Sequence, residues 1–155
     1  MAEYLMGIDA GTGSVRVALF DFRGQNRAYA VAEYGTTYPK NGWAEQSDYE
    51  WFEALKKAIP ECIKKAGIAA DNIAAITCDA TTNTLVYLDE NDTSVRPPIL
   101  WMDVRATEEA SFIDTIREEY DATKFYKPGF RADTMVPKCM WVKKNEPENW
   151  AKTKT

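Results

Sequence analysis

The residues best suited to chemistry in this sequence lie in a glycine-rich loop near the amino terminus. The segment Asp9-Ala10-Gly11-Thr12-Gly13-Ser14 joins two short apolar runs that are typical of β-strands. Glycine lets several backbone N–H groups approach and surround one anion. Two hydroxyl side chains add donors, and the next strand adds a cation. We therefore expect a phosphate-binding site lined by Gly11, Thr12, Gly13, Ser14 and Arg16.

Asp9 places a carboxylate at the mouth of the same loop. A carboxylate there repels a bare phosphate, so the position is useful only when a cation lies between the two. Mg²⁺ is the usual cation, because it keeps several waters and binds one or two carboxylates together with phosphate oxygens. We predict that Asp9 is a metal ligand and that the loop binds the phosphate tail of a Mg²⁺-bound nucleotide. The alternative is an ordinary β-hairpin with a glycine-rich turn, but the carboxylate, the hydroxyls and Arg16 together favour phosphate binding.

Several other chemistries are excluded by what the sequence lacks. The run from Gly11 to Arg16 has no third glycine of a dinucleotide fingerprint, a strand pattern follows it, and no P-loop motif occurs. The chain contains no histidine, which excludes a Ser-His-Asp triad, a Cys-His pair and a His-ligated zinc site. Any acid–base step must therefore use a carboxylate or a metal-bound group.

The composition suits one globular domain or one lobe of a larger protein, with 155 residues of which 45% are apolar. The net charge is −5 and no tract is rich in lysine or arginine, which argues against nucleic acid or a membrane as partner. No segment has the length of a membrane span or the pattern of a secretory signal. Cys62, Cys78 and Cys139 are widely spaced, as is typical of reduced, buried thiols. We expect a cytoplasmic protein, with a homodimer as an open possibility.

The apolar periodicity predicts three strands and then a helix. Short turns join the strands, so we expect an antiparallel meander over Tyr4–Ile8, Val15–Asp21 and Asn26–Tyr34. Helical periodicity follows from Trp51 to Ala66, with a candidate capping box at Ser47 and Glu50 and a candidate stop at Gly67. Pro60 should bend this helix without dividing it. Trp51 and Phe52 are expected in the core.

The rest of the chain mixes strands and helices. We predict a buried strand over Ile73–Asp79, a second strand over Thr84–Asp89, an extended segment over Arg96–Trp101, helices over Thr107–Tyr120 and Val136–Asn145, and a non-helical tail over Asn149–Thr155. Three antiparallel strands followed by parallel strands and flanking helices form the α/β mixed sheet of the ribonuclease-H-like fold, which actin, hexokinase and the Hsp70 ATPase domain share. This is the predicted fold class.

Four segments of the chain resemble the FGGY family of carbohydrate kinases, in the family's order. They are Gly7–Arg16, similar to the first phosphate motif; Gly42–Gln46 followed by Trp51, similar to G-W-x-E-Q…W; Ile99–Ala106, similar to L-W-x-D-x-R-A; and Pro137–Pro147, similar to P-K-x-x-W-x-K-x-N-x-P. The resemblance implies a two-lobed enzyme that transfers the γ-phosphoryl group of ATP, with Mg²⁺, to a hydroxyl of a sugar or polyol.

The same resemblance assigns candidate residues to the two ligands. Asp9 would lie near Mg²⁺ and the phosphates, while the sugar side would be formed by Thr82, Asn83, Trp101, Asp103 and Arg105. Each has a plainer alternative: turn residues at 82–83, a core tryptophan, and a local Asp–Arg ion pair. Glu45 and Gln46 are interpreted as structural. The run Cys78–Thr84 lacks the Q-M-H-G of xylulokinases and the R-E of glycerol kinases and is similar to ribulokinase-like members, which suggests a ketopentose such as ribulose.

Members of the family are much longer than this chain, and the resemblance places their catalytic aspartate and adenosine-binding lobe beyond Thr155. We therefore assign no catalytic residue here. We expect residues 1–148 to form an incomplete N-terminal kinase lobe, residues 149–155 to lead into the remainder, and the isolated chain to be inactive. Two alternatives stay open: a non-catalytic fragment that binds nucleotide or sugar, and an ATPase lobe of the actin or Hsp70 type.

Overall fold

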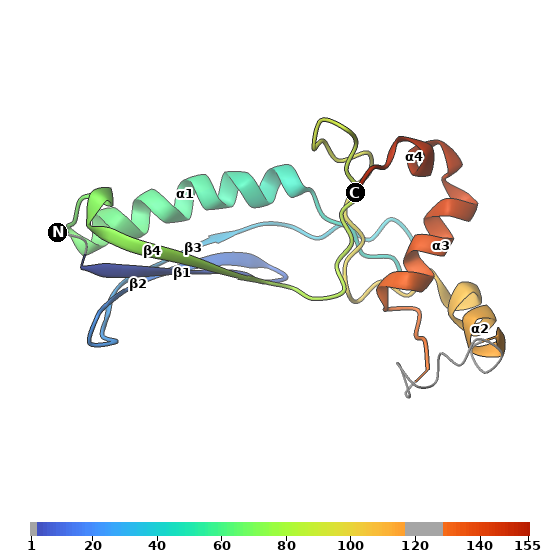
Figure 1. Ribbon diagram of the computed structural model, residues 1–155, viewed down its shortest axis with the longest axis horizontal. Helices are drawn as coiled ribbons and strands as arrows, with labels where there is room; N and C mark the ends of the chain where they lie inside the picture. The colour runs from blue at the N-terminus through green and yellow to red at the C-terminus, as the bar shows by residue number, and fades with distance from the viewer. Residues whose placement is uncertain (1–2, 117–128) are drawn as a thin grey trace. The chain divides into compact units, whose positions relative to one another are not determined.

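The computed structural model describes residues 3–116 and 129–155, which are arranged in two compact units (Figure 1). The sheet unit comprises Met1–Gly35 and Ser47–Thr81, and the loop unit comprises Thr36–Gln46 and Thr82–Thr155. Within the described residues, no helix is long and apolar enough to cross a membrane.

The sheet unit is built on a four-stranded mixed sheet with the order β3-β2-β1-β4. Its strands are β1 (Tyr4–Ala10), β2 (Ser14–Asp21), β3 (Asn26–Glu33) and β4 (Ile73–Ala80). The β1–β2 and β2–β3 pairs are antiparallel, while β4 pairs with β1 in parallel. The predicted meander and the change to a parallel strand are thus confirmed.

Helix α1 (Asp48–Ala66) covers one face of this sheet, mainly over β2 and β3. Buried side chains alternate with more exposed ones along β1, β2 and β3, as expected for a sheet with one covered face. Small residues on β3 and on the helix allow close approach, and the buried set includes Met6, Val15, Val17, Leu19, Ala28, Ala30, Ala54, Ala58 and Cys62. The helix is continuous through Pro60 and ends at Gly67, whose φ of 67° lies in the left-handed region that glycine favours. Ser47 occupies the N-cap position without a side-chain cap bond, so the predicted capping box does not form.

Further expectations for the sheet unit, all of them about burial, are wrong. Strand β4 forms, but most of it is exposed, because it lies at the sheet edge, has only β1 beside it and lies outside the main α1 contact. Ile76 is 59% exposed, and the Cys78 thiol is exposed instead of buried. Phe52 also faces solvent, with 60% exposure. Local composition indicates a strand or a helix, but it does not say which face finds a partner.

The loop unit contains α2 (Thr107–Ile116), α3 (Met135–Asn145) and α4 (Pro147–Lys152). The α3 helix begins one residue before its predicted start. The last four residues of the other predicted helix, 117–120, lie outside the described residues. The tail forms α4, contrary to prediction, with Pro147 in the first turn, where the missing N–H costs nothing.

The segment 84–89 is not a strand, which corrects a second prediction. It makes only isolated bridges, Leu85 with Ile99 and Leu88 with Ser94. The opposing segment contains Pro97 and Pro98, which have no N–H to donate, so a continuous ladder cannot form between the two segments. The described sheet therefore has one parallel strand and not the several that were predicted. A small apolar cluster of Tyr87, Ile99 and Val142 supports the paired loops.

Candidate functional site

The β1–β2 hairpin places an acidic and a basic side chain directly opposite each other. Asp9 and Arg16 are register partners on antiparallel strands, so both side chains leave the same face. Arg16 Nη1 donates to Asp9 Oδ2 at 2.9 Å, and each side chain is about half exposed, at 49% and 48%. This bond to Asp9 and its charge raise the pKa of Arg16. An exposed pair contributes little to stability, so its importance lies in where it holds the two charges.

The pair lies on the sheet face opposite α1, in a groove of about 340 Å³ that is lined by residues of all four strands. Its lining includes Gly7, Asp9, Arg16, Tyr29, Thr77 and Asp79. Gly7 contributes no side chain, so the middle of β1 is open there, with nothing within 4 Å of an added Cβ. The groove leaves the Asp9 carboxylate accessible from solvent.

The residues that were predicted to line the phosphate site differ in how accessible they are in the loop between β1 and β2. The Gly11 amide donates to Ser14 O at 3.0 Å, so it closes the turn instead of facing an anion. Ser14 is only 7% exposed and begins β2. Gly13 is exposed, and a Cβ added there would meet no atom within 4 Å. Among the predicted phosphate residues, Gly13 and Arg16 are thus the most accessible.

Tyr34 is a positioning residue that the sequence interpretation missed. Its hydroxyl donates to Gly11 O at 2.5 Å, and its backbone N–H donates to Gly13 O at 3.2 Å. Both bonds hold carbonyl groups of the loop. Burial, together with the Asp9 charge, raises the pKa of the Tyr34 hydroxyl, so it keeps its proton at neutral pH. The available signal was the meander itself, because the register Ser14–Glu33 brings the residue after Glu33 beside Gly13.

Asp9 fits a magnesium site of the kind the sequence predicts. Within residues 3–116 and 129–155, no group of three or more His, Cys, Asp or Glu side chains could hold a metal ion. A closed protein cage is therefore absent from the described part of the chain. Mg²⁺ bound by one carboxylate, its own waters and substrate phosphates requires no such cage. The half-exposed carboxylate of Asp9 meets that requirement.

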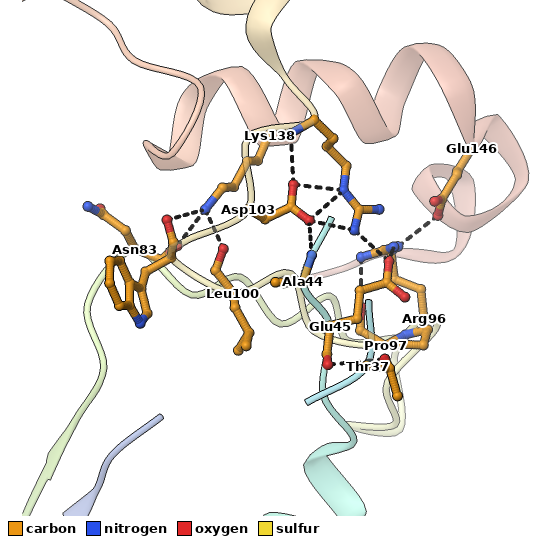
Figure 2. A network of polar contacts seen from close by, with 12 residues as sticks. Thr37, Ala44, Glu45, Asn83, Arg96, Pro97, Leu100, Asp103, Lys138 and Glu146 are labelled. Carbon is orange, nitrogen blue, oxygen red and sulfur yellow. Dashed lines mark hydrogen bonds and ion pairs between the residues drawn. The ribbon is translucent and has the colours of Figure 1, made fainter. Parts of the chain in front are cut away.

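In the loop unit, the predicted sugar-side residues Asp103 and Arg105 belong to a buried polar network, part of which Figure 2 shows. The Asp103 carboxylate accepts from the Ala44 N–H at 2.7 Å and from Arg105 Nη2 at 2.8 Å. Arg105 Nη2 also pairs with Glu45 Oε1 at 2.7 Å. Although burial opposes the charge, Asp103 and Glu45 raise the pKa of Arg105. Both side chains of the Asp103–Arg105 pair are 0% exposed.

The network continues through aromatic rings and a second arginine. The Arg105 guanidinium carbon lies 3.9 Å from the ring centroid of Trp43 and 5.0 Å from that of Trp141. Arg96 pairs with Glu45 at 2.7 Å and with Glu146 at 2.8 Å. The network therefore joins the Gly42–Gln46 motif to the segments around 96–105 and 141–146. Burial of Glu45 in this network agrees with its structural interpretation.

Comparison with known proteins identifies the family. The model of the FGGY family of carbohydrate kinases, N-terminal domain, matches residues 4–155. The chain belongs to the FGGY family of carbohydrate kinases. It is 34% identical to a xylulose kinase of Staphylococcus epidermidis over 96% of the chain and 29% of that protein. It is 31% identical to a glycerol kinase of Oleidesulfovibrio alaskensis over 98% of the chain and 31% of that protein.

The fold comparison gives the same family. A crystal structure of a xyloylose kinase from Brucella ovis superposes with a TM-score of 0.84 and 27% identity, covering 98% of this chain and 31% of that one. The chain thus spans roughly a third of the length of the FGGY proteins it matches. The four motifs that carried the resemblance all lie within the matched range.

The residues predicted to contact the sugar fall into two groups in the structure, one at least partly exposed and one enclosed. Thr82 is exposed, Trp101 is 43% exposed, and Asn83 is half-buried with a φ of 55°. Asp103 and Arg105 have no exposed side-chain surface that a sugar could contact in this structure. Their bonds instead fix the loop that follows Trp101. The sequence identified these two residues but could not indicate that residues of the Gly42–Gln46 motif enclose them.

Tyr34→Phe tests the clamp on the glycine loop. We expect a loss of about 1 kcal/mol in the free energy of unfolding, because one hydrogen bond to Gly11 O is removed. The Michaelis constant for ATP should rise, because the loop is less constrained. Denaturant titration and steady-state kinetics of the full-length protein measure the two effects. Tyr49→Phe is the control, since Tyr49 is 67% exposed on α1. Equal behaviour of the two variants would contradict the clamp.

Asp103→Asn tests the buried network. Removing the charge takes away one of the two carboxylates that pair with the buried Arg105 and leaves only Glu45 among the described residues. We expect a loss of about 3 kcal/mol in the free energy of unfolding. Glu108→Gln is the matched control, because Glu108 is 84% exposed in its pair with Lys144, and no measurable change is expected. Chemical denaturation distinguishes the two. An Asp103→Asn variant as stable as the wild type would show that the network contributes nothing to folding.

Proposed function

We propose that the protein containing this chain phosphorylates a hydroxyl of a sugar or polyol with ATP, and that its acceptor is a ketopentose such as ribulose. Membership of the FGGY family supports the reaction class. The observation that carries the proposal is the Asp9–Arg16 pair beside the exposed Gly13, since it offers a carboxylate, a cation and an open backbone at one point. Residues 1–148 would form the N-terminal lobe of this enzyme.

The hairpin would do the electrostatic part of the work. Phosphoryl transfer requires in-line positioning and compensation of phosphate charge more than covalent help from the protein. Arg16 supplies a positive charge, and the open backbone at Gly13 lets phosphate oxygens approach without a side chain in the way. Mg²⁺, when bound, supplies further charge neutralisation, and Asp9 is the residue that would hold it. Tyr34 keeps the loop in the conformation that receives the phosphates.

The loop unit would bind the acceptor. Thr82 and Asn83 carry polar groups suited to sugar hydroxyls, and the exposed part of the Trp101 ring suits the apolar C–H face of a sugar. Asp103 and Arg105 would contribute by fixing the loop beneath Trp101. No described carboxylate is assigned as the base that accepts the hydroxyl proton. A carboxylate in that role is expected from the family resemblance in a part of the enzyme outside this chain.

Three alternative functions predict different measurements. The relatives include xylulose and glycerol kinases, so xylulose and glycerol are the principal competitors to ribulose as acceptor. An actin-type or Hsp70-type ATPase would hydrolyse ATP without any sugar. A fragment that only binds ligands would give binding but no turnover. A cytoplasmic location and a homodimer stay predictions.

A coupled ADP-release assay of the full-length protein tests the proposal. With Mg·ATP we expect turnover that depends on the acceptor, with ribulose giving a higher kcat/KM than xylulose or glycerol. Asp9→Asn should lower kcat at least about 100-fold, because it weakens charge compensation at the transferring phosphoryl group. Asp21→Asn is the control, since Asp21 lies at the other end of β2.

Three outcomes would contradict the proposal in separable ways. A higher kcat/KM for xylulose or glycerol would reject ribulose and keep the reaction class. ATP hydrolysis that is independent of any acceptor would favour the ATPase alternative. Unchanged activity of Asp9→Asn would remove the hairpin from the mechanism.

A further inference from the structure

A fully buried lysine connects the two segments that are proposed to contact the sugar. Lys138 lies in the first turn of α3 and is 0% exposed. Its Nζ donates to the carbonyl oxygen of Leu100 at 2.7 Å, of Asn83 at 3.1 Å and of Trp101 at 3.5 Å. Figure 2 shows the ammonium pointing at Asn83 and Leu100 from the helix. Three acceptors match the three N–H donors of an ammonium group.

Burying a charged group at this position costs free energy of desolvation, which an apolar residue of similar size would avoid. Burial lowers the pKa of Lys138 to about 8, with Asp103 and Asp133 acting to raise it and Arg105 to lower it. The side chain is therefore an ammonium at neutral pH, below that pKa. Only a group with several donors can hold three carbonyl oxygens together. A methionine of similar length would fill the space but would leave the Asn83 carbonyl without this partner.

The contact with Asn83 acts on a backbone in an uncommon conformation. Asn83 has a φ of 55°, in the left-handed region that most residues with a Cβ avoid and that asparagine adopts more readily than most, so a modest constraint is enough to hold it there. The Lys138 bond to the Asn83 carbonyl supplies such a constraint. The same ammonium fixes the Leu100 carbonyl, which also accepts from the Asp103 N–H at 3.1 Å. The buried network and the lysine thus meet on the loop that carries Trp101.

We propose that Lys138 is a positioning residue of the acceptor site, which holds the Asn83 and Trp101 loops at the separation that the sugar requires. The inference rests on the proposed function, since it takes these two loops as the acceptor-binding elements. Lys138 itself does not touch the sugar. It acts by holding the backbone of both loops, so that the Asn83 side chain and the Trp101 ring can contact the acceptor at the same time.

Lys138→Met in the full-length protein tests the role, with Lys143→Met as control because Lys143 is exposed on the same helix. A displacement of the loops by a fraction of an ångström should lower kcat/KM for the acceptor by about 10- to 100-fold. The Michaelis constant for ATP should stay within about two-fold of the wild type, because the hairpin binds the nucleotide. Lys143→Met should leave both parameters unchanged. A purely structural lysine would lower the melting temperature without this split between the two substrates.

The outcomes separate the inference from the proposed function. Absence of acceptor-dependent turnover in the wild type would overturn the proposed function and the role of Lys138 with it. A second set of outcomes has an active wild type, with Lys138→Met either keeping the wild-type kcat/KM for the acceptor or showing equal losses for the acceptor and for ATP. Either result would overturn the role of Lys138 and leave the proposed function standing. If Lys138→Met does not fold, Lys138→Gln is the second variant, because its side-chain amide keeps N–H donors. It should show a smaller loss of kcat/KM for the acceptor, again without a matching change in the Michaelis constant for ATP. Failure of both variants to fold would show that Lys138 serves stability and would also overturn the inference.

Discussion

The antiparallel register of β1 against β2 sets the position of the chemically useful groups in the sheet unit. Ile8 pairs with Val17 and Asp9 pairs with Arg16, so the apolar pair lies under α1 and the charged pair on the opposite face. A slip of one residue would exchange these faces, because side chains alternate along a strand. The cost of exposing the core side chains therefore also keeps the two charges on the accessible side. Folding and the candidate phosphate site are consequences of the same register.

The loop unit uses a different principle, because its apolar cluster is small. Buried charges join segments that are distant in the sequence, and each charge has several partners. Asp103 bonds to the Ala44 N–H, which is 59 positions earlier in the chain, and Arg96 connects Glu45 with Glu146. Burying a charge is expensive unless its donors and acceptors are matched. Such a network tolerates few alternative arrangements, which suits the proposal that these loops present Asn83 and Trp101 to the acceptor in one geometry.

The sequence was sufficient wherever local pattern determines structure. Period-two alternation indicated the meander, and the glycine at position 67 indicated the end of α1. The phosphate site in the loop from Asp9 to Arg16 stays a prediction. The sequence was insufficient where partners decide the outcome. The apolar composition of Ile73–Ala80 predicted a strand correctly, but exposure depends on what lies beside the sheet edge. Residues 84–89 have strand composition, but the prolines opposite prevent a ladder.

The candidate site follows the same division between local pattern and distant partners. Asp9 and Arg16 meet because they are close in sequence and a hairpin joins them. Tyr34 was missed because its bond to Gly11 spans 23 positions and depends on the register of a third strand. Asp103 and Arg105 were identified from their motif, but their enclosure depends on distant residues such as Trp43 and Glu45. Burial by residues that are distant in the sequence therefore decides which side chains stay accessible to a ligand and which ones only hold the loops in place.

The central claim is that the β1–β2 loop binds the phosphates of a Mg²⁺-bound nucleotide. The most direct test is a titration of the ¹⁵N-glycine-labelled full-length protein with Mg·ATP, followed by the amide resonances of Gly11, Gly13 and Gly24. Gly24 is the internal reference, because it lies in the β2–β3 turn at the opposite end of β2. The account predicts saturable shifts of the Gly11 and Gly13 resonances, dependent on Mg²⁺ and absent at Gly24. Binding of Mg·ATP without any change at Gly11 or Gly13 would contradict it.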